Sequence, residues 1–269
     1  MTVFLLEWRN LRKSNLTSTV TICGVIFLML LFFPSMQTES MKALAGAKLE
    51  GIDPAILEAL GLTNMMDFTV ITNYFGYVLQ YITLAVMVIV TQRAVLLLSK
   101  EEADGTIEYL YSKPVSRDEI FLQKVLALLA SLFLMTVSFM AVTVAGYLMV
   151  TDYRFDKAVR EAYIFYGSIF FVGLVFSSVG ILISALLRGG KGTGGITIGI
   201  VFGTFILGIA SLTVKQLEFL IWFSPMDWIK ALKLMTEGIL PEEWAVGIAV
   251  MTLSIAAAWT FYRKKDLLV

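Results

Sequence analysis

The chain has 269 residues, of which 58% are hydrophobic and only 16% are charged, and its mean hydropathy is +0.82. Soluble domains carry roughly 45–50% apolar and about 25% charged residues, so this composition excludes an ordinary soluble domain and indicates an integral membrane protein. The 21 basic and 21 acidic residues balance, which gives no sign of nucleic-acid binding, and the lack of histidine excludes His-based catalysis. Because the apolar runs are continuous and not alternating, the sequence predicts an all-α membrane protein whose spans are helices.

Residues 1–15 form a basic amphipathic stretch before the first apolar run. We expect them to form an interfacial helix that lies flat on the membrane, with a plain basic flank to the first span as the alternative. One helical face carries apolar side chains and the other carries basic ones: Phe4, Trp8 and Leu11 against Arg9, Arg12 and Lys13.

Six apolar runs are long enough to cross a bilayer as helices, which takes about 20 residues. The second run contains Arg93, the one basic residue within a predicted span, which we expect to reach toward the phosphate layer. A contact that steers the charged stretch after this span is the alternative. The fourth run is rich in glycine and serine, which predicts a helix that packs closely against others. The predicted spans are residues 16–33, 74–98, 125–150, 162–187, 196–214 and 244–262, in a single membrane domain over residues 1–269.

Segments between the spans have distinct compositions. For residues 35–73 we expect a compact helical cap, with a partly ordered loop as the alternative. Residues 151–161 read as a short loop, and residues 215–243, with several tryptophans, as an interfacial or re-entrant helix. The glycine-rich turn at 188–195 is not a Walker loop, because Lys191 is followed by glycine and no strand precedes it.

The distribution of basic residues predicts the orientation. With the N-terminus inside the cell, 13 Lys and Arg residues fall on the cytoplasmic side and eight on the outer side. This bias favours a multi-pass protein of the cell membrane with both termini in the cytoplasm.

The most polar stretch is residues 99–124, called here the charged segment, in which ten of 26 residues are charged. Apolar residues at helical spacing predict a short helix with one apolar face, which Pro114 ends. Ser116 and Glu119 form an S-x-x-E capping box that predicts the start of the next helix. An ordered helix with an apolar stripe favours a docking surface, and a solvated loop is the alternative.

The charged segment resembles the cytoplasmic segment of type-2 ABC transporter permeases. The similarity lies in the run E-x-x-G-T-I-E-Y-L-x-x-x-P-V-S-R-x-E-I-x-x-x-K, and it departs from the family at Gln123, where a glycine often precedes the lysine. The SPMDW run around Pro225 and the terminal FYRKKDL also resemble the family, so the likeness covers essentially the whole chain. Matching positions in the charged segment are Glu102, Gly105, Thr106, Ile107, Glu108, Leu110, Pro114, Val115, Ser116, Arg117, Glu119, Ile120 and Lys124.

This resemblance implies six transmembrane helices with an N-terminal interfacial helix and a cytoplasmic coupling helix that binds a separate ABC ATPase subunit. It further implies a homodimer in contact with membrane lipids, with ATP and Mg on the ATPase and no catalytic, cofactor or metal site in this chain. The ATPase-facing residues are then expected among Glu101, Glu102, Gly105, Thr106, Ile107, Glu108, Leu110, Tyr111, Pro114 and Arg117.

The energy source is the remaining question at the level of sequence. The predicted spans contain no Asp or Glu, so they offer no internal ion relay, and energy would have to arrive through the charged segment. Together with the resemblance this predicts an ATP-driven exporter of a hydrophobic or amphipathic substrate, such as a peptide, an antibiotic or a lipid. The alternative is an ATP-independent membrane scaffold or receptor that docks a cytosolic partner through residues 99–124.

Overall fold

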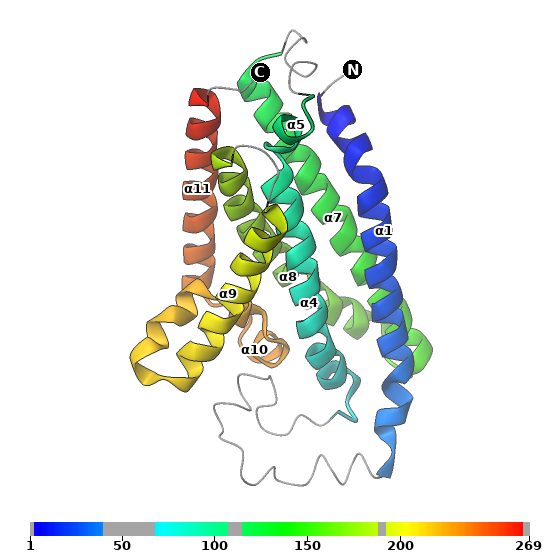
Figure 1. The fold of residues 1–269 in the computed structure, drawn as a ribbon. Coiled ribbons are helices and arrows are strands. Elements are labelled where there is room, and N and C mark those ends of the chain that lie inside the picture. Colours follow the sequence, from blue (N-terminus) through cyan, green and yellow to red (C-terminus); the bar gives the residue numbers. More distant parts are fainter. Residues whose placement is uncertain (1–2, 40–67, 107–114, 188–191, 266–269) are drawn as a thin grey trace.

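A computed structural model describes residues 3–39, 68–106, 115–187 and 192–265. Long helices form an elongated bundle, and the described residues contain no strand (Figure 1). In chain order the elements are α1 (Val3–Phe32), η1 (Phe33–Gln37), α4 (Ile71–Leu96), α5 (Lys100–Ala103), α7 (Arg117–Val150), α8 (Phe155–Leu186), α9 (Thr193–Thr213), η2 (Lys215–Phe223), η3 (Asp227–Ile229), α10 (Ala231–Thr236) and α11 (Pro241–Lys264).

Six of these helices, α1, α4, α7, α8, α9 and α11, are long and apolar enough to cross a membrane. The shortest, α9, has 21 residues and so extends about 32 Å, which matches the hydrocarbon thickness of about 30 Å. Each contains or closely overlaps one predicted span. The expectation of an all-α integral membrane protein with six transmembrane helices is therefore confirmed.

The N-terminal residues do not form a separate helix across the bundle axis. α1 runs without a break from Val3 to Phe32, so its first turns continue the first span, as in the alternative of a basic flank. The physical reason is a single buried face that includes Val3, Glu7, Ile22, Ile26 and Leu30 and packs along α7. No proline interrupts the 30 residues, and the face stays in register with its partner along the whole helix.

α8 is the most buried of the long helices, and it packs against α4, α7 and α11. Its small residues allow this close approach, as the sequence predicts. At Gly180 an added Cβ would lie 2.6 Å from the Cβ of Ala94 and 3.2 Å from the carbonyl oxygen of Thr91, both on α4. Any larger side chain there would push the two central helices apart.

α8 begins seven residues earlier than predicted, so the connection to α7 is only residues 151–154. The polar residues expected in a loop are helical because Glu161 turns into the bundle and is 4% exposed. Its carboxylate accepts hydrogen bonds from Thr72 Oγ1 at 2.8 Å and from the hydroxyl of Tyr153 at 2.5 Å. These bonds fix the first turns of α8 against the start of α4.

Residues 215–243 form a hairpin and a short cap at the end of α9. η2 folds back against α9, and α10 packs on α4 and α8 (Figure 1). Ser224 donates to the carboxylate of Asp227 directly under Gly208, where an added Cβ would overlap both groups. The cap is also joined to α11 by an ion pair between Lys233 and the buried Glu243.

The chain ends and α5 lie at one end of the bundle, and the η2–α10 cap lies at the other (Figure 1). We call the first the terminal end. This arrangement places residues 99–106 and 115–124 of the charged segment beside the start of α1 and the end of α11 (Figure 1).

Candidate functional site

The described parts of the charged segment, residues 99–106 and 115–124, lie at the terminal end. Leu98 and Ser99 anchor its beginning, because their backbone N–H groups donate to Ser184 Oγ of α8 at 2.8 and 3.2 Å. Ser116 begins α7 as predicted: its hydroxyl accepts from the backbone N–H of Glu119 at 3.2 Å. The segment is therefore held at both sides of the stretch 107–114, which lies outside the described residues.

Gly105 ends the single turn of α5 in a left-handed conformation, with φ of 66°. The N–H of Thr106 reaches back to the carbonyl of Glu101 at 2.9 Å, which closes the turn in the manner of a Schellman motif. A side chain at Gly105 would meet open space, so it is the backbone conformation and not crowding that favours glycine here. Both Gly105 and Thr106 are exposed.

Lys124 of α7 is 1% exposed and joins three elements of the terminal end. Its Nζ lies 3.2 Å from Glu7 Oε2 of α1 and 2.8 Å from the carbonyl oxygen of Leu97 after α4, and it pairs with Glu101 of α5. One buried ammonium thus faces two carboxylates and a carbonyl. The buried charge of Lys124 is tolerated because these partners compensate it, and the loss of one of them would destabilise the fold.

A second buried ion pair joins the charged segment to the end of α11. Lys265 Nζ donates to Glu102 Oε2 at 2.9 Å and to the carbonyl oxygen of Leu187 at 2.6 Å. Both charged side chains are less than a tenth exposed. The pair therefore holds α5 against the carboxyl ends of α8 and α11 together.

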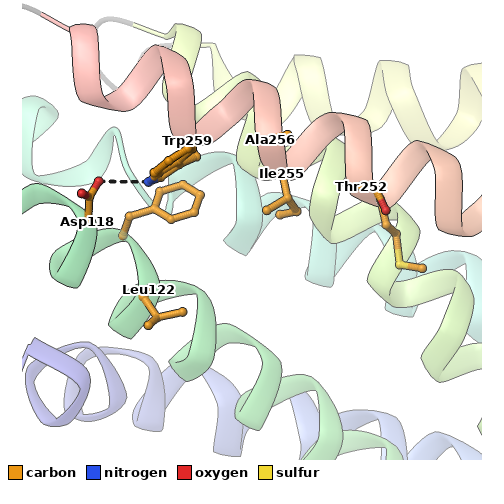
Figure 2. Close-up of a pocket in the computed structure, with 8 residues that line it drawn as sticks. Asp118, Leu122, Thr252, Ile255, Ala256 and Trp259 are labelled. Carbon is orange, nitrogen blue, oxygen red and sulfur yellow. Dashed lines mark hydrogen bonds between the residues drawn. The ribbon is translucent and has the colours of Figure 1, made fainter.

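Arg117 provides a third connection at the terminal end, and this one joins α7 to α11. Its Nη1 donates to the carbonyl oxygens of Arg263 at 3.1 Å and of Lys265 at 2.8 Å. Carbonyls at a helix carboxyl end lack intrahelical donors and carry partial negative charge, so a guanidinium complements them. Next to it, Asp118 accepts from Trp259 Nε1 at 2.9 Å, a bond that Figure 2 shows.

Gln123, the position that departs from the resembled family, has a clear role in this fold. Its Oε1 accepts from the backbone N–H of Phe4 at 2.8 Å. The first N–H groups of a helix have no partner within it, so Gln123 satisfies one of them from α7. The start of α1 is thus fixed next to the Lys124 ion pairs.

The structure places the predicted interface residues in three groups. Glu101, Glu102 and Arg117 make internal bonds across helices, whereas Gly105 and Thr106 are exposed. Ile107, Glu108, Leu110, Tyr111 and Pro114 lie outside the described residues, so their role stays a prediction.

Sequence reasoning missed the residues that bind Glu101 and Glu102. These are the buried cation Lys124, with its second partner Glu7, and Lys265. The available signal was one acid within a basic N-terminal flank, a lysine just before the third predicted span, and another lysine after the last span. None of these tells which charges meet, because the partners are far apart in sequence.

Arg93 differs from its prediction. Arg93 as a whole is 8% exposed, and its guanidinium does not reach outward: it donates to Asn15 Oδ1 at 2.8 Å, to the carbonyl of Ser14 at 3.0 Å and to Ser18 Oγ at 3.1 Å, all on α1. Neutral acceptors from α1 replace water around the charge. Arg93 therefore fixes α1 to α4 about one helical turn before Leu97, whose carbonyl binds Lys124.

Fold and site together define a class: a multi-pass helical membrane protein in which a charged connecting segment is tied to several spans by buried ion pairs. The chain belongs to the ABC-2 family transporter proteins, whose family model matches residues 1–267. It is thus a type-2 ABC transporter permease, the membrane component of such a transporter. A search of curated proteins finds no match.

Proposed function

We propose that this permease is the membrane subunit of an ATP-driven exporter in the cell membrane. Two copies form a homodimer, and each docks one separate cytosolic ATPase through the charged segment, with ATP and Mg bound by the ATPase. The terminal end faces the cytoplasm, and the transporter moves a hydrophobic or amphipathic substrate, such as a peptide, an antibiotic or a lipid, outward. The chain itself catalyses no reaction.

One observation carries this proposal: the charged segment is tied by buried ion pairs to other helices. A displacement of α5 acts through Glu101 and Lys124 on α7 and, through Glu7, on α1. It acts through Glu102 and Lys265 on α11 and on the end of α8. Separating these buried charges would leave each one without its partner, which is unfavourable, so the links favour joint movement of the segment and the helices. ATPase closure against the segment would then shift several spans together.

The substrate class rests on the apolar character of the spans. The predicted spans contain no Asp or Glu, so a strongly cationic or ion-coupled cargo finds no carboxylate near the membrane centre. An apolar or amphipathic molecule needs no such partner.

The docking step can be tested at Gly105. Valine there is strained at positive φ, whereas asparagine adopts this conformation readily. With the ATPase reconstituted in vesicles, we expect G105V to lower co-purification of the two subunits and permease-dependent ATP turnover, and G105N to retain both. Equal behaviour of G105V and the native chain would contradict docking through this segment.

The transmission step can be tested at Glu102. We expect E102Q to keep the ATPase bound but to reduce ATP-dependent substrate export, because the connection to Lys265 is weakened. Glu119→Gln is the matched control, since Glu119 is exposed. Among the described residues, the one hydrogen bond to its carboxylate comes from Gln123 on the same helix. Native-like ATPase binding without any ATP-dependent transport in the native chain would instead support a scaffold.

A further inference from the structure

A groove of about 680 Å³ lies between α7 and α11 near the terminal end (Figure 2). Its walls are mostly apolar: Asp118 accepts from Trp259 at one end, and at the other end the hydroxyl of Thr252 donates to the carbonyl oxygen of Ile248 within α11 (Figure 2). The apolar walls are formed by Phe121 and Leu122 of α7 and by Met251, Ile255 and Ala256 of α11.

The groove exists because α7 and α11 each pack mainly on other helices. α7 lies along α1 and α11 lies along α8, and α7 and α11 contact each other at few positions. Leu122 remains 57% exposed and Trp259 39% exposed. Within a bilayer this face is covered by hydrocarbon or by protein, since water is absent there.

The groove has the polarity and length of one lipid leaflet. From Trp259 to Met251 the helix rises about 12 Å, against about 15 Å for half of the hydrocarbon core. At its polar end the guanidinium of Arg263 lies 4.8 Å from the Trp259 ring and is half exposed, followed by the exposed Lys264. Indole and basic side chains at this level suit a phosphate headgroup above an apolar chain.

We propose that the groove binds a phospholipid from the leaflet on the terminal side. One acyl chain lies between Leu122 and Ala256, and the phosphodiester contacts Arg263 at the polar end. This lipid is a resident of the permease, so the assignment does not depend on which substrate is exported. Arg263 pairs with Asp118 at 3.3 Å and its carbonyl accepts from Arg117, so the headgroup sits beside the contacts of the charged segment.

A second copy of the chain fits this groove less well. A two-fold contact presents the same surface on both copies, so it would bring two sets of Arg263 and Lys264 toward each other. At this end Arg263 and Lys264 carry two positive charges against the one carboxylate of Asp118, and the remaining positive charge is complementary to a phosphate.

The test uses the full chain in nanodiscs that contain a phosphatidylglycerol with a photoactivatable group in the middle of one acyl chain. After illumination and digestion, mass spectrometry maps the labelled peptides. We expect labelling of residues 118–122 and 251–259 to exceed several-fold that of the exposed α9 positions Ile198 and Ile206. Ala256→Phe, which fills the groove, should abolish this excess.

Ala249→Phe is the matched control, because Ala249 is exposed on the same helix but does not line the groove. It should leave the labelling unchanged. Arg263→Gln should lower the number of phospholipids that remain bound in native mass spectrometry, with native-like unfolding temperature as the check on folding. Labelling equal to that of α9, or labelling unaffected by Ala256→Phe, would overturn the proposal.

Discussion

Replacing Lys124 by methionine removes the ammonium but keeps the length of the side chain. The carboxylates of Glu7 and Glu101 would then face each other, with 7% and 16% of their side chains exposed and their shared counter-ion gone. Removing one partner of a buried pair typically costs about 3–5 kcal/mol, because it leaves an uncompensated charge. With about 2–4 °C per kcal/mol for a chain of this size, the unfolding temperature should fall by roughly 6–20 °C.

Thermal unfolding in nanodiscs, followed by tryptophan fluorescence, measures this loss. The decisive comparison adds Glu7→Gln and Glu101→Gln to Lys124→Met, which removes all three charges together. Because a neutral replacement of a buried ion cluster is often nearly neutral in stability, the triple variant should regain most of the loss. A triple variant no more stable than Lys124→Met, or a loss below about 1 kcal/mol for Lys124→Met alone, would refute the reasoning.

Three further predictions concern packing and the far end of the bundle. Gly180→Ala should destabilise the bundle by about 1–3 kcal/mol in thermal unfolding, since its Cβ would meet α4, whereas Gly167→Ala, with open space around it, should not. Gly208→Ala should speed limited proteolysis of the η2–α10 cap that its Cβ would displace, and Gly203→Ala, a matched control on α9, should leave cleavage unchanged. Tyr153→Phe should lower stability by about 1–3 kcal/mol at neutral pH, because a buried carboxylate loses a donor. Burial, and then the bond to that carboxylate, raises the pKa of Tyr153 above 10.0, so the difference between native and Phe chains should be complete below pH 10 and shrink as the pH rises through the folded-state pKa.

The spans could be predicted from sequence because length and hydropathy alone decide which helices fit a bilayer. The start of α7 could also be predicted, since Ser116 and Glu119 form a local signal that no distant contact overrides. The beginning of α8 could not, because Glu161 is polar in the sequence but is buried through contacts with Thr72 and Tyr153.

The ion pairs at the candidate site could not be predicted from the sequence either. Lys124 and Glu7 are 117 positions apart, and only the packing of α1 on α7 brings them together. A charge pattern shows that partners are needed without showing which ones meet. For the same reason the sequence does not show that Glu101 and Glu102 carry bonds within this protein, while their contact with an ATPase stays a prediction.

The unbroken course of α1 has a consequence for how the two membrane faces communicate. Its 30 residues form a rod about 45 Å long, which exceeds the thickness of the bilayer core. At its far end the carbonyl of Met29 accepts from the hydroxyl of Tyr74 at 2.8 Å. A tilt imposed on the first turns of α1 is therefore transmitted to the Met29 end of the helix, because no break in α1 lies between them to absorb it.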